Sequence, residues 1–307
     1  MIKLKIIFLG TPDFAVPILE ALNDKYEVLL AVSQPNRVKK KGVLLDTPVA
    51  KKAKELNINL FQPEKISDCY EEISKIDADV MVTAAYGQYI PTKILKLFKC
   101  AINVHASLLP KHRGGAPIQR CLMNGDKVTG VSIMEMTKRL DAGRVFSQKE
   151  YVIEKSDNST ILFNKLSIIG KDLLMDSIED IYSGKNKGVI QDESKMTYSP
   201  NILPEEEMID LCKPTSQIIN KIRGLSYEPG AYLKVNDIKL KVFKACEYQY
   251  FGNEAPGTVL CVKKRIIIKT LDTAIELLEV LYPGKKIMSG QDFSNGQKIF
   301  TLNDVLK

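Results

Sequence analysis

The first half of the chain alternates short apolar runs with helix-like stretches. Runs rich in β-branched and other apolar residues occur at 4–10, 27–33, 78–85, 100–106 and 129–136. Between several of them, as at 16–24, apolar residues recur at the spacing of a helix. Strand, helix and strand in repeated order predict an α/β fold, in which a Rossmann-like, mostly parallel sheet carries helices on both faces.

One of these helices has a clear start signal. Thr47 is a good N-cap residue, and Pro48 after it would occupy the first helical position. We therefore predict a helix within 47–56.

The pattern changes in the second half. A long helical pattern at 158–183 is followed by a polar stretch at 184–207, poor in apolar periodicity and containing two prolines, which we interpret as a linker. After a short helix at 212–224, the chain shows closely spaced strands with turn signals, typical of a small OB-like β-barrel. These strands are expected at 231–235, 239–248, 257–263, 265–271 and 274–283.

The length of 307 residues fits about two domains. We expect a catalytic domain at 1–188, a linker at 189–207 and a C-terminal β-barrel domain at 208–307.

Composition narrows the class of protein. No segment approaches the roughly 18 continuous apolar residues that cross a bilayer, and Lys5 interrupts the N-terminal apolar run, so we interpret this run as a buried strand and expect no membrane contact. The six cysteines are scattered without a C-x-x-C pair, which indicates no disulfide framework. With only two histidines, a metal site is not expected. These features favour a cytoplasmic protein.

Both histidines lie in the stretch NVHASLLPKHRGGAPI, at 103–118, which begins at the end of a predicted strand. Asn103 and His105 would point to the same face of that strand. Asp141 lies in a turn after the strand ending near Met136, and in a parallel sheet this turn would lie beside the first. An amide donor, a titratable imidazole and an orienting carboxylate suit acyl transfer through a tetrahedral intermediate. On spacing alone, a structural histidine with a turn-capping aspartate stays an open alternative.

The loop that follows is irregular. Pro110 and the Gly114-Gly115 pair let a flat ligand lie against main-chain groups, although a plain connection would look the same. We expect His112 to be a solvated loop residue without a role. The stretch 10–15 lacks the G-x-G-x-x-G spacing and so gives little support for a dinucleotide site.

Positive charge gathers in two places. The stretch 37–42 reads RVKKKG, which would suit contact with phosphates, although such runs are usually just solvated. From Lys213 to Lys307 there are 15 Lys and Arg against 9 Asp and Glu, a net charge of +6 out of +7 for the whole chain. A basic small barrel fits contact with a nucleic-acid backbone, and a surface kept basic for solubility is the alternative.

Taken together, several motifs resemble the folate-dependent formyltransferase family. N-x-H at 103–105, SLLPKHRGGAPI at 107–118 and LDAG at 140–143 carry this resemblance. Further segments resemble those members of the family whose acceptor is methionine esterified to initiator tRNA, so that the likeness covers essentially the whole chain. These segments are 8–15, 85–91, 197–202, 222–232 and 280–297.

The resemblance implies a reaction. The formyl group of 10-formyltetrahydrofolate would pass to the α-amino group of methionine on initiator tRNA, for translation initiation, without a metal and in a monomeric enzyme. It also implies that Asn103, His105 and Asp141 form the catalytic set, in which the first two stabilise the oxyanion and the third orients His105 and helps to relay the amine's proton.

The resemblance implies binding residues as well. The folate would lie against two loops, with contacts expected from Tyr86, Gln88, Ile90, Ser107, Leu108, Leu109 and Pro110. The acceptor stem of the tRNA would contact a basic loop, with contacts expected from Arg37, Lys39, Lys40 and Lys41.

Two other functions remain possible from the sequence. The first is a related folate-dependent formyltransferase or hydrolase that acts on a small-molecule acceptor or on water, for which a second basic domain would be unnecessary. The second is a nucleic-acid-binding α/β protein without activity, in which N-x-H and LDAG would be incidental.

Overall fold

The structure, a computed structural model, describes residues 3–38, 44–296 and 298–306. These residues form two compact units. The first comprises the chain up to Pro117 together with 128–152 and 163–200, and the second comprises 118–127, 153–162 and the chain from Asn201. The chain therefore leaves the first unit at 118–127 and again at 153–162 before it enters the second unit finally at Asn201. The predicted boundaries at 188 and 208 stay a prediction.

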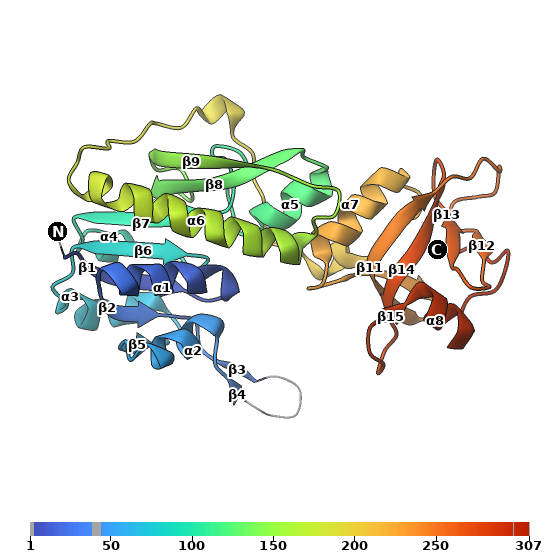
Figure 1. Ribbon diagram of the computed structural model, residues 1–307, viewed down its shortest axis with the longest axis horizontal. Coiled ribbons are helices and arrows are strands. Elements are labelled where there is room, and N and C mark those ends of the chain that lie inside the picture. The colour runs from blue at the N-terminus through green and yellow to red at the C-terminus, as the bar shows by residue number, and fades with distance from the viewer. Residues whose placement is uncertain (1–2, 39–43, 297, 307) are drawn as a thin grey trace. The chain divides into compact units, whose positions relative to one another are not determined.

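The first unit is built on a seven-stranded sheet, shown in Figure 1. Its four pairings from β5 to β7 are parallel, whereas β8 and β9 are antiparallel to their neighbours. The prediction of a mostly parallel, Rossmann-like sheet is confirmed. In spatial order the strands are β5 (Leu60–Phe61), β2 (Glu27–Val32), β1 (Lys5–Gly10), β6 (Val80–Ala84), β7 (Cys100–His105), β8 (Val128–Glu135) and β9 (Val145–Val152).

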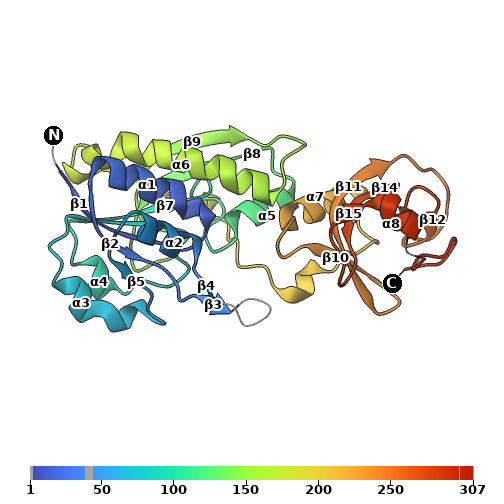
Figure 2. The same ribbon diagram turned by 60° about the horizontal axis from the view of Figure 1, so that its bottom comes forward.

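Helices cover both faces of this sheet (Figure 2). α1 and the long α6 lie on one face, and α3 and α4 on the other, where Ile73 and Ile94 join a core with alternate residues of β1, β2 and β6. The helices of this unit are α1 (Val16–Lys25), α2 (Pro48–Glu55), α3 (Tyr70–Ser74), α4 (Thr92–Leu95) and most of α6 (Ser159–Tyr182), with 3-10 turns at Asp13–Ala15, Ile66–Cys69 and Glu193–Lys195 and a two-stranded ribbon of β3 (Arg37–Val38) and β4 (Leu44–Leu45). All but the first residue of α5 (Pro117–Asn124) belongs to the second unit.

Two local features explain how these helices are placed. The Oγ1 atom of Thr47 accepts a hydrogen bond from the main-chain N–H of Ala50 at 3.2 Å, and Pro48 is the first residue of α2, so the predicted helix start is confirmed. On α6, a Cβ atom at Gly170 would lie 2.8 Å from Cγ1 of Val104. The absence of a side chain there lets α6 pack close to β7.

One expectation about the sheet is wrong. β8 runs antiparallel to β7, with Ile102 paired to Glu135 and His105 to Ser132. The turn containing Asp141 therefore does not extend from a parallel neighbour, but approaches His105 from the loop that joins β8 to β9. The connection between β7 and β8 is irregular, so the apolar pattern of the sequence does not show in which direction β8 runs.

The second unit contains an antiparallel sheet of half-barrel form, in the order β10-β11-β14-β13-β12 with β15 beside β14. The sequence predicts a small OB-like β-barrel, and its barrel-like β architecture is confirmed. α7 and α8 bury Ile222 and Phe293 in its core. The elements are α7 (Thr215–Leu225), β10 (Ala231–Val235), β11 (Ile238–Tyr248), β12 (Val259–Cys261), β13 (Ile267–Lys269), β14 (Ala274–Leu281), β15 (Met288–Ser289) and α8 (Gly290–Gly296), preceded by a 3-10 turn at Pro204–Glu207.

Among the described residues, no helix combines the length and the apolar character that crossing a membrane requires.

Candidate active site

Asn103 and His105 lie at the C-terminal end of β7, two residues apart, as the sequence predicts. The Oδ1 atom of Asn103 accepts a hydrogen bond from Oγ1 of Thr83 on β6, at 2.8 Å. This bond fixes which end of the amide faces Thr83, and it leaves the NH2 group of Asn103 as the end that a ligand would meet.

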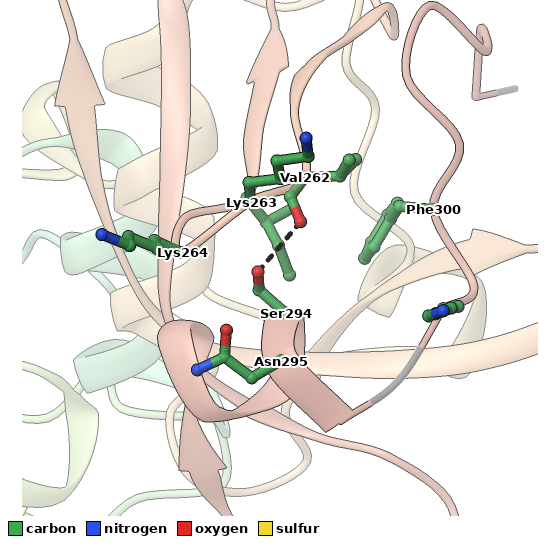
Figure 3. Close-up of a pocket in the computed structure, with 8 residues that line it drawn as sticks. Val262, Lys263, Lys264, Ser294, Asn295 and Phe300 are labelled. Atoms are coloured by element: carbon green, nitrogen blue, oxygen red, sulfur yellow. Dashed lines mark hydrogen bonds between the residues drawn. The ribbon is translucent and has the colours of Figure 1, made fainter.

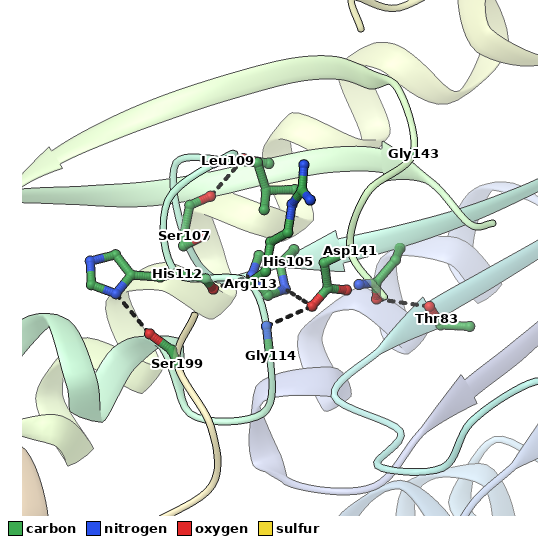
Figure 4. Close-up of polar contacts among 12 residues, drawn as sticks. Thr83, His105, Ser107, Leu109, His112, Arg113, Gly114, Asp141, Gly143 and Ser199 are labelled. Carbon is green, nitrogen blue, oxygen red and sulfur yellow. Dashed lines mark hydrogen bonds and ion pairs between the residues drawn. The ribbon is translucent and has the colours of Figure 1, made fainter. Parts of the chain in front are cut away.

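The imidazole of His105 is held at one nitrogen and faces a carboxylate at the other (Figure 4). Its Nε2 atom lies 2.9 Å from the main-chain oxygen of His112. A carbonyl can only accept, so Nε2 carries a proton. Nδ1 lies 3.8 Å from Oδ2 of Asp141, and the His105 and Asp141 side chains are only 6% and 11% exposed.

The loop that carries Asp141 is anchored next to the glycine pair. Oδ2 of Asp141 accepts a hydrogen bond from the main-chain N–H of Gly114 at 2.8 Å. At Gly114, φ is +118° and a Cβ atom would lie 2.7 Å from the main-chain oxygen of Ser199. Only glycine fits here, and the glycine brings its N–H to the carboxylate.

The loop that follows β7, from Ala106 to Ala116, is held by side chains of β8 and β9. Oγ of Ser132 donates to the main-chain oxygen of Ser107 at 2.6 Å and accepts from the N–H of Leu109 at 3.1 Å. Gln148 donates to the Leu109 carbonyl at 2.9 Å. The peptide bond from Leu109 to Pro110 is cis. The hydrogen bonds of Ser132 and Gln148 hold this loop in one path above the sheet.

The predicted folate residues divide into two kinds. Tyr86, Ile90, Ser107 and Leu109 are buried; Tyr86 and Ile90 are part of the core against α3 and α4. Burial raises the pKa of the Tyr86 phenol, whose oxygen has no hydrogen-bond partner among the described residues. Gln88 accepts from the N–H of Ile66 at 2.9 Å. These side chains support the loops from inside.

The groups beside them are open to a ligand. Ala85, Gly87 and Tyr89 are exposed between the buried residues of the 85–91 loop, and Leu108 and Pro110 are half-buried. A flat heterocycle fits such a surface, because it would meet main-chain groups on one side and apolar side chains on the other.

The expectation that His112 is solvated is wrong. His112 is only 8% exposed. Its Nδ1 lies 2.8 Å from Oγ of Ser199, and its main-chain N–H donates to Oγ1 of Thr197. Flanking Lys111 and Arg113 made the position look like a surface turn. The burial comes from the segment at 197–199, which lies beside the loop although it is distant in sequence.

Two further residues near the site were missed by sequence reasoning. Arg113 is 1% exposed, and its guanidinium donates to Oε1 of Gln191 and to the Glu193 carboxylate. Gln191 donates in turn to main-chain oxygens in the turn of Asp141. No periodicity could reveal Gln191, because its neighbours Val189 and Ile190 are 73% and 72% exposed while it is buried.

The basic loop is only partly described. The backbone at Arg37 pairs with that at Leu45 in the β3–β4 ribbon. Lys39, Lys40 and Lys41 lie outside the described residues. The predicted tRNA contacts therefore stay predictions.

The second unit contains a basic pocket of about 400 Å³ (Figure 3). Val262, Ile266 and Phe300 supply its apolar lining, and Oγ of Ser294 donates to the main-chain oxygen of Val262 across it. Three exposed lysines line the same pocket: Lys263, Lys264 and Lys298.

Sequence comparison gives the chain close relatives. A model of the formyl transferase family matches residues 4–178, and a model of the formyl transferase C-terminal domain matches residues 201–298. A methionyl-tRNA formyltransferase from Streptococcus pneumoniae serotype 19F (strain G54) is 44% identical over 298 residues, which cover 95% of this chain and 95% of the relative. The protein of that name from strain JJA matches equally well.

Solved structures share the fold at lower identity. HypX from Aquifex aeolicus, in complex with tetrahydrofolic acid, has a TM-score of 0.68 and 16% identity, covering 100% of this chain, which spans about half (51%) of the HypX chain. WlaRD, a sugar 3N-formyl transferase crystallised in the presence of dTDP and 5-N-formyl-THF, has a TM-score of 0.69 and 20% identity, covering 93% of this chain and 100% of its own.

Proposed function

This chain belongs to the formyl transferase family, and on that premise we propose that it transfers the formyl group of 10-formyltetrahydrofolate to the α-amino group of methionine esterified to initiator tRNA. Support comes from the methionyl-tRNA formyltransferases that match along 95% of the chain. The proposal is carried by one observation: Nδ1 of His105 lies beside the Asp141 carboxylate. His105 is on β7, the strand that also presents Asn103.

Asn103 has the first role in the reaction. When the free amine attacks the formyl carbon, the carbonyl oxygen becomes an oxyanion. The Asn103 amide, held at Oδ1 by Thr83, presents its NH2 group as a donor to that oxygen. A donor fixed before the reaction stabilises the transition state more than the planar ground state.

His105 and Asp141 handle the proton. The attacking nitrogen must lose a proton as the new C–N bond forms, and the folate nitrogen must gain one as the old C–N bond breaks. Because Nε2 of His105 is already protonated toward His112, a second ring proton would sit on Nδ1, facing Asp141. The carboxylate stabilises the resulting imidazolium, so the pair can accept the amine's proton, directly or through water, and return it.

The folate would lie across two loops. Main-chain groups of 85–89 would meet its polar edge, and the half-buried Leu108 and Pro110 its ring face. In this arrangement Tyr86, Gln88, Ile90, Ser107 and Leu109 shape the loops from beneath and do not need to touch the ligand with their side chains.

The tRNA would be held by positive charge in two places. Arg37 with Lys39 to Lys41 would contact the acceptor stem, and Lys263, Lys264 and Lys298 around the pocket of the second unit would contact phosphates further along the tRNA. We propose a monomer, as the resemblance to the family implies.

One assay tests the function. Purified protein is incubated with 10-formyltetrahydrofolate and either methionyl initiator tRNA, a small amine such as an aminosugar, or buffer alone, and the formylated product or released tetrahydrofolate is followed. We expect formyl-methionyl-tRNA. Formylation of the small amine alone, or release of formate alone, would favour the alternative acceptor, and tRNA binding without any transfer would indicate a binding protein.

A further inference from the structure

Gln191 joins the segment after α6 to the turn that carries Asp141. Its Nε2 atom donates to the main-chain oxygen of Asp141 at 2.8 Å and to that of Gly143 at 2.8 Å. Both protons of one amide are thus used on two carbonyls of the same turn. The residue is only 8% exposed, so water competes little for these bonds.

The orientation of this amide is fixed from its other end. Oε1 of Gln191 accepts from Nε of Arg113 at 3.1 Å and from Nη2 at 2.8 Å. A guanidinium can only donate, so the amide oxygen must face Arg113 and the NH2 group must face the turn. Arg113 is itself 1% exposed and is paired with Glu193, whose pKa it lowers.

Two contacts hold Asp141, one at its side chain and the other at its main chain. Arg113 is followed by Gly114, whose N–H holds the carboxylate, while Gln191 holds the main chain of the same residue. At Asp141, φ is +47°, a conformation that an aspartate keeps only when its surroundings determine it. Nδ1 of His105 lies 3.8 Å from this carboxylate, so small shifts of the turn change their separation directly.

We propose that Gln191 is a positioning residue, which sets the distance between Asp141 and His105 and acts on the reaction through Asp141. This inference rests on the proposed function for its effect on turnover, but the geometry can be measured without it.

Gln191→Glu is the most selective variant. A carboxylate still accepts from Arg113 but donates to neither carbonyl of the turn. We expect kcat to fall about 10- to 100-fold, because misplacement of a reacting group by about 1 Å can cost 100-fold, with KM for both substrates changed by less than roughly twofold. The matched control is Asp192→Ala, an adjacent, exposed residue that caps the next 3-10 turn through the N–H of Ser194. It should leave kcat unchanged.

A double variant separates positioning from general support. In an Asp141→Asn background, Gln191→Glu should cost nothing further, because its effect passes through the carboxylate already lost. Losses that multiply, or an equal loss of kcat in Asp192→Ala, would overturn the proposal.

A measurement without turnover completes the test. The chain has only two histidines, so selective labelling gives two imidazole signals, which a His112→Gln variant assigns. Gln191→Glu should shift the His105 signal, as Asp141→Asn does, and Asp192→Ala should not. An unmoved His105 signal would refute the positioning role even if the protein formylates no tRNA, whereas a shifted signal with an inactive wild type would leave the positioning intact and reject the proposed function.

Discussion

At the scale of single residues, each polar group of the candidate site is held by a hydrogen-bond partner that fixes which of its atoms is left for a ligand. Thr83 turns the Asn103 amide, the His112 carbonyl turns the His105 ring, and the N–H of Gly114 turns the Asp141 carboxylate. Each holding group is a hydrogen-bond partner on a neighbouring strand or loop, so these polar groups are oriented without a ligand.

Thr83→Val tests the first of these contacts. Valine keeps the shape of threonine but leaves the Asn103 amide free to turn, so kcat should fall on the order of 10-fold, less than the roughly 100- to 1,000-fold typical of losing an oxyanion donor altogether. Formylation rates at saturating substrate measure the effect.

Thr129→Val is the matched control for this prediction. Thr129 is buried on β8, and its hydroxyl has no hydrogen-bond partner among the described residues. Removing that hydroxyl should therefore leave kcat unchanged and should not lower the melting temperature. Equal rates for Thr83→Val and the wild type would show that the amide needs no such support.

The sequence could predict which residues meet at the site better than it could predict what holds them. Asn103 and His105 follow from the period of a strand, whereas their relation to Asp141 is implied only by the resemblance to the formyltransferase family, since spacing left it open and β8 is antiparallel to β7. The surroundings of His112 and Gln191 do not, because segments far away in the sequence bury them, against the local polarity of their neighbours.

At the scale of elements, predictions succeeded where a local signal decides the structure. Thr47 and Pro48 start α2 because capping depends on adjacent residues. The direction of β8 depends on how an irregular loop crosses the sheet, so its antiparallel pairing with β7 could not be read from an apolar run.

Asp272 gives an element-scale prediction about acid stability. Its carboxylate accepts from the hydroxyl and the N–H of Thr215, the first residue of α7, and from the N–H of Thr273. These bonds lower the pKa of Asp272 to about 2. A lowered folded-state pKa stabilises the protein above the unfolded-state value near 4 and loses this contribution as the pH falls through about 2.

The test compares melting temperatures of wild type and Asp272→Asn from pH 7 down to pH 2. At pH 7 the variant should have a lower melting temperature, because its free energy of unfolding is smaller by about 1 kcal/mol, the usual cost of a lost helix cap. The difference in melting temperature should shrink below about pH 4. Asp237→Asn, an exposed carboxylate paired with Lys234, should show no such convergence. A difference that stays constant with pH would mean that the charge of Asp272 contributes nothing.

At the scale of the whole molecule, net positive charge is concentrated in the chain from Lys213 onward, which belongs to the second unit, whereas the candidate active site belongs to the first. Of the net charge of +7, +6 lies in the residues from Lys213 to Lys307, and the pocket of the second unit is lined by three lysines. Charge composition could predict a polyanionic partner for this unit. Which lysines surround one pocket depends on how the β12–β13 turn meets the chain around α8, which the composition does not contain.

Replacing Lys39, Lys40 and Lys41 together by Gln should weaken tRNA binding and flatten its dependence on salt. For each phosphate contact that is lost, tRNA binding releases about one counterion fewer. The slope of log affinity against log salt should therefore fall in magnitude by about one per lysine that makes a contact. A control triple with the same charge change, Lys75, Lys96 and Lys185, all exposed, should leave the slope unchanged. Equal effects of the two triples would indicate attraction by net charge alone.

The kinetics of His105→Ala test the central claim most directly: that His105, with Asn103 and Asp141, carries the transfer of a formyl group to an amine on tRNA. Turnover should fall about 100- to 10,000-fold, as for loss of a general acid–base group, while the dissociation constant for methionyl initiator tRNA stays within roughly twofold. A loss of tRNA affinity equal to the loss of turnover, or a variant that formylates as fast as the wild type, would contradict it.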